Sequence, residues 1–172
     1  MVVQTNAFRD ARGQFDRLFD LQALSAIHGE RTIHQINHSI THEVGAIRGL
    51  HFQVPPHGEA KWVRCIRGRV WDVAVDLRKG SPTFLKHAAV ELSSDSMRAF
   101  FIPEGCAHGF QVLEPDSELL YLHTREYVPG ADLGLRWDDP RLAISWPMAP
   151  TMISERDRNH PLMTSNFEGL EE

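Results

Sequence analysis

One alternating stretch decides the fold of this chain: Trp62-Val63-Arg64-Cys65-Ile66-Arg67-Gly68-Arg69-Val70-Trp71-Asp72-Val73-Ala74-Val75-Asp76-Leu77. Most side chains at every second position are apolar, and a period of two residues is typical of a β-strand with a buried face. The Arg67-Gly68 pair in the middle supplies the residue types of a turn. The stretch therefore predicts two strands joined by a turn.

Further strands with the same period follow along the chain. We predict them over residues 84–92, 98–102, 108–113 and 118–124. Strands about ten residues apart, with turn residues between them, indicate a sandwich or barrel of antiparallel sheets. The predicted fold class is therefore all-β.

Helical patterns are weak and lie near the two ends, over residues 20–27 and 154–159, where Ser154 is a candidate cap. Residues 129–150 are rich in Asp, Pro and Trp and are expected to form an ordered surface loop. We find no internal repeat and no linker. A length of 172 residues suits a single domain, and we assign residues 1–172 to one.

Composition excludes several classes of protein. A net charge of -5 argues against a general nucleic-acid binder, so an anionic ligand has to be held by locally placed arginines. No apolar run reaches the roughly 18 residues of a membrane helix, and we expect neither a membrane partner nor a signal peptide. Two cysteines, Cys65 and Cys106, are too few for a disulfide framework, which favours the reducing cytoplasm.

Ten histidines make metal binding the first hypothesis to consider. Pro103-Glu104-Gly105-Cys106-Ala107-His108 resembles the second motif of the cupins, which are double-stranded β-helix or jelly-roll proteins. Metal-binding cupins add a His-x-His pair and a glutamate. Here Phe52 and Gln53 follow His51, and two prolines precede His57 and Glu59. We therefore expect the jelly roll without a metal ion.

Three basic side chains nonetheless occur among the predicted strands. His51 lies in Arg48-Gly49-Leu50-His51-Phe52-Gln53, Lys61 follows ten residues later, and His108 lies in the cupin-like segment. Each has a simpler structural explanation. His51 could be hydrogen-bonded at a strand end, His108 could mark a tight start to a strand between two glycines, and Lys61 could be a solvated edge residue.

Two further side chains are candidates only in combination with these. Tyr121 lies among leucines on a predicted strand and is by itself more typical of a core residue. Asp157 has Arg156 and Arg158 as neighbours and is by itself typical of a surface carboxylate. The case for chemistry depends on all of these residues occurring together.

Taken together, the segments resemble the deoxysugar-nucleotide epimerases of the dTDP-4-dehydrorhamnose 3,5-epimerase family, from about Ala7 to Met163. The resemblance is carried by Asp10-Ala11-Arg12-Gly13-Gln14-Phe15, Gln35-Ile36-Asn37-His38-Ser39, Arg48-Gly49-Leu50-His51-Phe52-Gln53, residues 73–84, residues 102–110 and Arg136-Trp137-Asp138-Asp139-Pro140. It implies a metal-free, cofactor-independent jelly roll, usually a homodimer, that acts on a nucleotide-linked 4-keto-6-deoxyhexose.

The resemblance also implies catalytic roles. His51 is the base that removes a proton next to the ketone, and Asp157 holds its other ring nitrogen. Lys61 stabilises the negative charge that grows on the keto oxygen, and His108 helps to polarise or bound the same site. Tyr121 returns a proton from the opposite face, which inverts the carbon.

Binding roles follow from the same resemblance. The diphosphate is expected to meet Arg12 and Arg48, because a planar guanidinium suits phosphate oxygens. Polar positions around the nucleotide match Gln35 and Asn37, whereas the base or sugar is expected to pack on Phe15 and Tyr127. Exchange of the N-terminal segment between subunits could change which ligand a residue meets.

Some details are left open by the sequence. Arg48 and His51 have opposite strand parity, and a bulge at Gly49 would let both enter the site. Leu122-His123 follows Tyr121 where many relatives carry lysine, and Arg17 replaces an acidic residue of some relatives. These departures concern the identity of the substrate.

Three functional hypotheses remain. The preferred one is an isomerase that epimerises the sugar nucleotide at C3 and C5, with inversion at C3 or C5 alone as a variant. The second is a non-catalytic jelly-roll protein that binds a sugar nucleotide, and the third is a metal-dependent cupin enzyme. A pure binder has no use for a base and an acid together, which favours the enzyme.

Overall fold

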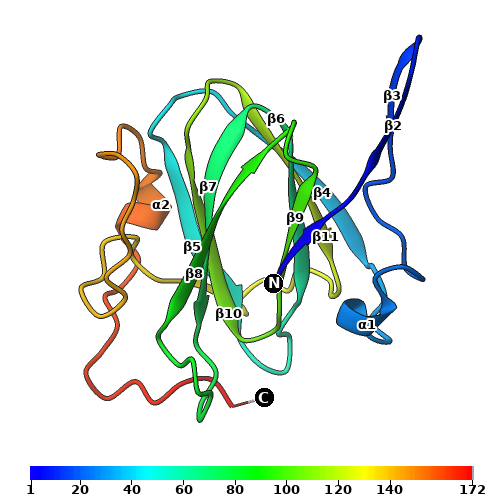
Figure 1. Ribbon diagram of the computed structural model, residues 1–172. Helices are drawn as coiled ribbons and strands as arrows, with labels where there is room; N and C mark the ends of the chain where they lie inside the picture. Colours follow the sequence, from blue (N-terminus) through cyan, green and yellow to red (C-terminus); the bar gives the residue numbers. More distant parts are fainter. Residues whose placement is uncertain (172) are drawn as a thin grey trace.

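Two five-stranded sheets face each other in the computed structural model, which describes residues 1–171 (Figure 1). The first sheet consists of β1 (Val2–Gln4), β9 (Arg98–Ile102), β6 (Lys61–Arg67), β11 (Ser117–His123) and β4 (Gln35–Thr41), in that order. The second consists of β12 (Asp132–Gly134), β5 (Ile47–Gln53), β10 (Cys106–Val112), β7 (Arg69–Asp76) and β8 (His87–Ser93). The chain crosses repeatedly between the two sheets, and this all-β jelly roll confirms the predicted fold class.

The interior between the sheets is apolar at one end of the strands. Val63, Phe100 and Leu119 of the first sheet meet Val70 and Phe110 of the second. All of these side chains are buried, as expected for strands whose alternate residues point to opposite faces. Burial of this kind is the main stabilising contribution to the fold.

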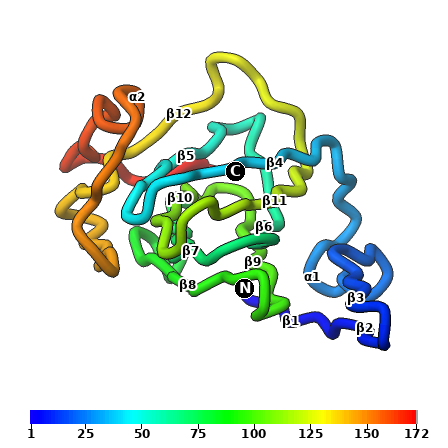
Figure 2. Tube along the Cα trace, turned by 90° about the horizontal axis from the view of Figure 1, so that it is seen from above, coloured from blue at the N-terminus to red at the C-terminus, as the bar shows by residue number. Residues whose placement is uncertain are grey.

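Both outer faces are partly covered by the terminal segments of the chain. The C-terminal segment packs Leu135, Leu142 and Met163 against Leu50 and Phe52 of β5, and Figure 2 shows it along the outside of the second sheet. On the first sheet, the segment around the one-turn helix α1 (Ser25–His28) packs against Trp62. Strands β5 and β6 are therefore enclosed on both faces, which keeps their inward side chains in fixed positions.

A hairpin of two short strands, β2 (Ala7–Asp10) and β3 (Gly13–Asp16), projects away from this body (Figure 1). Most of its side chains are exposed, and Phe8 and Phe15 each keep 64% of their surface in contact with solvent. An aromatic pair in this position has no part in the core of its own chain.

Several predicted boundaries are confirmed. The strand over residues 98–102 matches β9, and that over 118–124 matches β11 to within one residue. Ser154 caps helix α2 (Glu155–Arg158), where its Oγ accepts a hydrogen bond of 3.0 Å from the backbone N–H of Asp157.

Other boundaries are wrong, for identifiable reasons. The strand predicted from Phe84 begins only at His87, because the hydroxyls of Ser81 and Thr83 each donate to Asp76 at 2.6 Å and stabilise a turn. The predicted helix over residues 20–27 is reduced to α1, preceded by a turn. The predicted loop over residues 129–150 contains strand β12.

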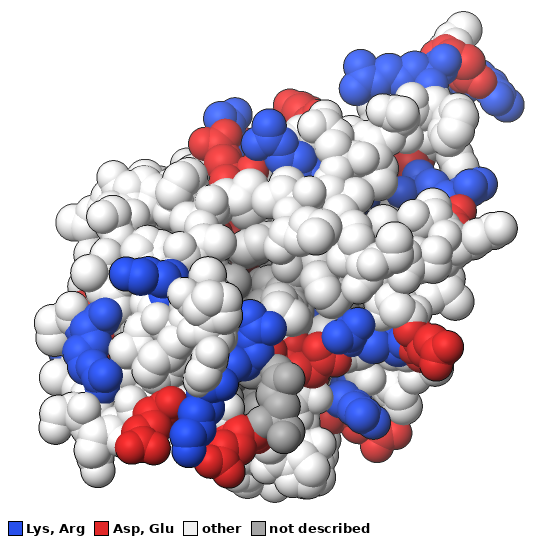
Figure 3. Space-filling model, turned by 60° about the horizontal axis from the view of Figure 1, so that its bottom comes forward, with Lys and Arg blue, Asp and Glu red and all other residues white. Residues whose placement is uncertain are grey.

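The length of the helices and the charges on one face of the molecule bear on the classes of ligand. No helix in residues 1–171 is long and apolar enough to span a membrane. Basic and acidic side chains are intermixed on the face that Figure 3 displays. A ligand with negative charge therefore depends on particular arginines, as the net charge already indicates.

Candidate active site

The central feature of the site is a histidine–aspartate pair that joins the second sheet to the C-terminal segment. Nε2 of His51 lies 2.7 Å from Oδ1 of Asp157, and the second carboxylate oxygen accepts a hydrogen bond of 3.0 Å from the N–H of Gly49. Burial alone would raise the pKa of Asp157, but the hydrogen bonds from His51 and Gly49 outweigh it and lower that pKa. An ionised Asp157 fixes the proton of neutral His51 on Nε2 and leaves Nδ1 as the basic nitrogen.

A bulge at Gly49 aligns the strand with this site. His51 pairs with His108 across β5 and β10, but Arg48 already pairs with Phe110, so three residue steps on β5 face two on β10. Gly49 has a φ of 106°, and a Cβ there would lie 2.5 Å from the carbonyl oxygen of His108. Only glycine fits, and the bulge resolves the opposite parity of Arg48 and His51, as the sequence predicts.

A second buried cluster surrounds Lys61. Its ammonium lies 2.9 Å from one oxygen of Glu59, whose other oxygen lies 2.7 Å from Nδ1 of His123. Burial opposes ionisation of Glu59, but the hydrogen bond from His123 and the charge of Lys61 lower its pKa to about 2. Lys61 is 5% exposed, so it is not the solvated edge residue that the simpler explanation expected. A fixed ammonium of this kind can stabilise developing negative charge.

Tyr121 and His108 occupy the space between the two sheets. The rings of Tyr121 and His108 lie edge to face, with centroids 6.1 Å apart, and the tyrosine also stacks on His123 at 6.0 Å. The hydroxyl of Tyr121 is 3.1 Å from Oγ of Ser39. Burial raises the pKa of Tyr121 above its usual range, so its phenol retains a proton at neutral pH. His108 is therefore adjacent both to His51 on the next strand and to Tyr121 on the opposite sheet.

The imidazole of His108 is held in the same way as that of His51. Its Nε2 lies 2.9 Å from Oδ1 of Asp72, and both side chains are buried. The other oxygen of Asp72 has no hydrogen-bond partner among the described residues. Neighbouring strands of one sheet thus present two histidines, each with a carboxylate behind it.

A pocket of about 350 Å³ opens at the outer end of this arrangement. It is lined by His51, Asp157, Arg48 and Arg156, together with small and apolar side chains. Arg48 is exposed, and among the described residues its guanidinium donates to the carbonyl of Ile40 alone, at 3.1 Å. Its remaining donors can meet an anionic group at the mouth of the pocket.

The expected nucleotide-binding positions form a second, more open region. Gln35 and Asn37 lie on β4, where Asn37 pairs with Tyr121 of β11, and Oε1 of Gln35 accepts a hydrogen bond of 2.7 Å from the N–H of Tyr127. The ring of Tyr127 is 55% exposed. These three residues therefore lie along one edge of the first sheet, beside the strand that carries Tyr121.

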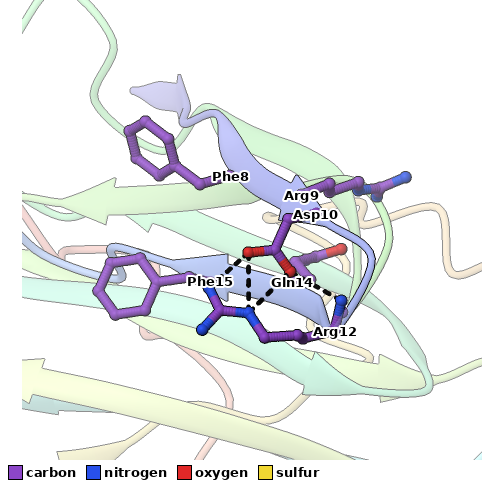
Figure 4. A pocket seen from close by; sticks show the side chains of 7 residues that line it. Phe8, Arg9, Asp10, Arg12, Gln14 and Phe15 are labelled. Atoms are coloured by element: carbon purple, nitrogen blue, oxygen red, sulfur yellow. Dashed lines mark hydrogen bonds and ion pairs between the residues drawn. The ribbon is translucent and has the colours of Figure 1, made fainter.

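Arg12 and Phe15 lie apart from all of these residues. Both belong to the projecting hairpin β2–β3, where Arg12 is paired with Asp10 at 2.5 Å beside a hollow of about 360 Å³ lined only by hairpin residues (Figure 4). The side chains of Phe8 and Phe15 lie together, with ring centroids 6.4 Å apart. Within one chain, these two expected binding residues are not brought to His51.

Some residues of the site were missed by sequence reasoning. In the sequence, Glu59 is considered only as a metal ligand that is then set aside, and Asp72 is not singled out. Only the folded sheets place these two carboxylates behind Lys61 and His108. His160 lies beside the His51–Asp157 pair, with its Nε2 3.5 Å from Oδ1 of Asp157. For Asp72, the sequence signal was the alternation of inward- and outward-facing side chains along β6 and β7. Once the sheets are known, this alternation places Lys61 and Asp72 at inward-facing positions.

The fold and this interior define the class of the protein: a cupin-like jelly roll that carries acid–base groups between its sheets. The chain matches the family model described as dTDP-4-dehydrorhamnose 3,5-epimerase over residues 1–165. It belongs to that family, and it is therefore an isomerase of the epimerase type, as its sequence motifs indicate.

Relatives from several organisms support this assignment. The chain is 39% identical over 161 residues to the dTDP-4-dehydrorhamnose 3,5-epimerase of Sinorhizobium fredii, covering 93% of this chain and 83% of the relative. The crystal structure of the Bacillus anthracis enzyme with TDP and PPi bound has a TM-score of 0.91, 37% identity, and covers 94% of this chain and 93% of that one. The Legionella pneumophila enzyme in complex with dTDP-4-keto-L-rhamnose has a TM-score of 0.88, 35% identity, and coverage of 92% and 85%.

Proposed function

We propose that the protein epimerises a dTDP-linked 4-keto-6-deoxyhexose at C3 and C5. The observation that carries this proposal is the His51–Asp157 pair and its neighbours. His51 lies opposite His108 on the next strand, and the ring of His108 contacts the ring of Tyr121. A base and an acid on different sides of one interior are what inversion of a carbon requires. The family membership supports the choice of a sugar nucleotide as substrate.

In the proposed reaction, Nδ1 of His51 removes the proton from the carbon next to the ketone. The electrons move onto the keto oxygen, where the ammonium of Lys61 and the imidazole of His108 stabilise the enolate. The phenol of Tyr121 then returns a proton to the opposite face of the same carbon. Repetition at the second carbon requires the ring to shift or turn in the interior between the two steps.

Binding of the nucleotide is assigned to the more exposed residues. Arg48 at the mouth of the pocket meets the diphosphate, and Gln35, Asn37 and Tyr127 meet the nucleoside part. Arg12 and Phe15 complete the site from the hairpin of a second copy of the chain. We therefore propose a homodimer, because the exposed aromatic pair on the hairpin has no partner surface within its own chain.

The proposed setting is the cytoplasm, and neither a metal ion nor an organic cofactor takes part in the proposed reaction. Enolate formation at a ketone needs only a placed base and a placed positive charge. Fractionation of the native host tests the location, and activity that is retained after chelation tests the metal-free reaction.

The reaction is tested by incubation of the protein with dTDP-4-keto-6-deoxyglucose in heavy water, followed by proton NMR. We expect deuterium at both C3 and C5 and inversion at both centres. Deuterium at one carbon only would restrict the function to a single epimerisation. Deuterium at neither carbon would contradict the enzymatic function for this substrate and favour a binding protein.

A further inference from the structure

A third imidazole lies against the His51–Asp157 pair and has no role in the proposed reaction. The ring of His160 is edge-on to that of His51, with centroids 5.7 Å apart, and its Nε2 lies 3.5 Å from Oδ1 of Asp157. This distance is too long for a hydrogen bond, and Nε2 of His160 is buried without a hydrogen-bond partner among the described residues. A buried imidazole nitrogen in this state needs an explanation.

Packing explains the position of the ring but not its chemistry. His160 rests directly on the backbone of β12, where a Cβ on Gly134 would lie 2.2 Å from Nε2. An apolar ring would fill this space without burying an unpaired nitrogen. The nitrogen faces the one carboxylate oxygen that His51 already contacts.

The three side chains lie close enough together to share a metal ion. Their ligand atoms all lie within 4.8 Å of one another. Bonds of about 2.0–2.1 Å to a tetrahedral ion place neighbouring ligand atoms roughly 3.3 Å apart. The contact of 3.5 Å between His160 and Asp157 already suits this spacing, whereas the 2.7 Å contact of His51 has to open by a few tenths of an ångström. The ligand atoms of the two histidines, which lie within 4.8 Å of each other, have to approach by up to about 1.5 Å through rotation of the side chains.

We propose that His51, Asp157 and His160 form a site for a divalent transition-metal ion of the Zn²⁺ type, and that occupation of this site inhibits the enzyme. Imidazole and carboxylate are ligands that such ions prefer. Gly49 holds the other oxygen of Asp157, so Oδ1 is available as the third ligand. The pocket beside His51 and Asp157 leaves access for the ion and for a water molecule as fourth ligand.

The arginines of the pocket do not prevent binding. Arg48 and Arg156 both line it, but the guanidinium of Arg156 forms an ion pair with Asp132 of β12 and that of Arg48 donates to the carbonyl of Ile40. With Asp157 included, the two arginines and the two aspartates carry no net positive charge that would repel a cation.

Inhibition follows from the tautomer of His51. In the metal-free protein Asp157 holds the proton on Nε2, and the lone pair on Nδ1 acts as base. An ion bound to Nε2 takes the place of that proton, so the neutral imidazole carries its proton on Nδ1 instead. Nδ1 then has no lone pair to accept a proton from the sugar. This consequence depends on the proposed function, whereas metal binding does not.

Binding is tested without substrate, by calorimetric titration of the chelator-treated full chain with Zn²⁺ and by the visible absorption of bound Co²⁺. We expect one ion per chain, and a loss of affinity of about tenfold or more in His160→Asn and in His51→Asn. His42→Asn is the matched control, because His42 is exposed and paired with Asp116 on the surface. Its affinity is expected to equal that of the unmodified protein.

Absence of stoichiometric binding, or equal affinity in the two ligand variants and the control, would overturn the proposal. If His160→Asn does not fold, His51→Asn alone decides, because every ligand of a real site has to contribute. In a second arm, Zn²⁺ is expected to inhibit turnover of the unmodified protein but not of His160→Asn. Inhibition equal in both proteins would contradict the inhibitory role, even where the binding titration supports the site.

Discussion

The interior of the jelly roll and the projecting hairpin both contain pairs of a basic and an acidic side chain, but the two regions differ in how far these pairs are buried. In the interior, Lys61 is 5% exposed and is fixed by Glu59, whereas on the hairpin the side chain of Arg12 is 90% exposed and is paired with Asp10, two residues away. Charge–charge contacts are strong in a buried environment and weak in water. Of the two regions, only the interior therefore holds its charged side chains in fixed positions before the substrate binds. The comparison shows that one chain brings together the proposed acid–base groups, whereas the exposed side chains of the hairpin lie apart from them.

The largest effect is expected from removal of the base in the interior. His51→Asn keeps a polar group near Asp157 but cannot accept the sugar proton. We expect deuterium exchange at C3 and C5 to fall by about a hundred- to ten-thousand-fold, with little change in the dissociation constant of dTDP. Exchange is measured by proton NMR and dTDP binding by calorimetry. Exchange at the rate of the unmodified protein would remove His51 from the mechanism.

The role of the hairpin is tested by mixing two impaired variants. If Arg12 serves the site of a second copy, a heterodimer of Arg12→Ala and His51→Asn contains one complete site and one site without either group. After denaturation and joint refolding in equal amounts, half of the dimers are mixed, and about a quarter of the original activity should return at low substrate concentration.

No gain over the separate variants would place Arg12 in the site of its own chain or outside any site. The control is a mixture of His51→Asn with Tyr121→Phe. Both changes lie in the interior, and each heterodimer then keeps two defective sites.

A smaller effect is expected at the mouth of the pocket. Arg48→Lys keeps the positive charge but loses the two-pronged contact with phosphate oxygens. We expect KM to rise by about tenfold with kcat nearly unchanged, as measured by initial rates. Arg67→Lys is a matched control, because Arg67 lies on the exposed end of β6 and pairs with Glu118. An equal response of the two variants would count against a diphosphate role for Arg48.

The contrast between the regions also predicts how stability depends on pH. The pKa of Glu59 is lowered from 4.5 to about 2, so its ionised form stabilises the folded state above pH 4.5, and this contribution is lost as the pH falls toward 2. The contribution is at most roughly 3.5 kcal/mol, at about 1.4 kcal/mol per unit of pKa.

The measurement is the free energy of unfolding of Glu59→Gln and of the unmodified protein from pH 7 to pH 2. The difference between them is expected to shrink across this range. Asp10→Asn on the hairpin is the control: the pKa of Asp10 is lowered by its hydrogen bonds with Arg12, but its side chain is 52% exposed. A similar loss of stability in Asp10→Asn would mean that burial does not distinguish the two regions.

Sequence reasoning succeeds where local pattern decides the structure. The alternation around Arg67-Gly68 predicts β6 and β7, and Ser154 predicts the start of α2. The bulge at Gly49 could be predicted because Arg48 and His51 otherwise point to opposite faces. Each of these features depends on residues close together in the chain.

It fails where the outcome depends on contacts between distant residues. Glu59 meets His123 and Asp72 meets His108 only after the sheets have assembled, and the spacing of these residues in the sequence does not predict the two pairs. The alternation of residues predicts a strand from Phe84. That prediction is wrong because side-chain hydrogen bonds to Asp76 stabilise a turn there, and the alternation does not reveal these bonds. The distance of the hairpin from His51 is likewise a property of the whole fold.

The most direct measurement compares proton exchange with inversion in Tyr121→Phe. The variant is incubated with dTDP-4-keto-6-deoxyglucose in heavy water, and deuterium incorporation and the configurations at C3 and C5 are read from the same NMR spectra. If His51 removes the proton and Tyr121 returns it from the opposite face, the variant incorporates deuterium but forms little inverted product. An equal loss of exchange and inversion would contradict the acid role of Tyr121 and assign it to binding or to enolate formation.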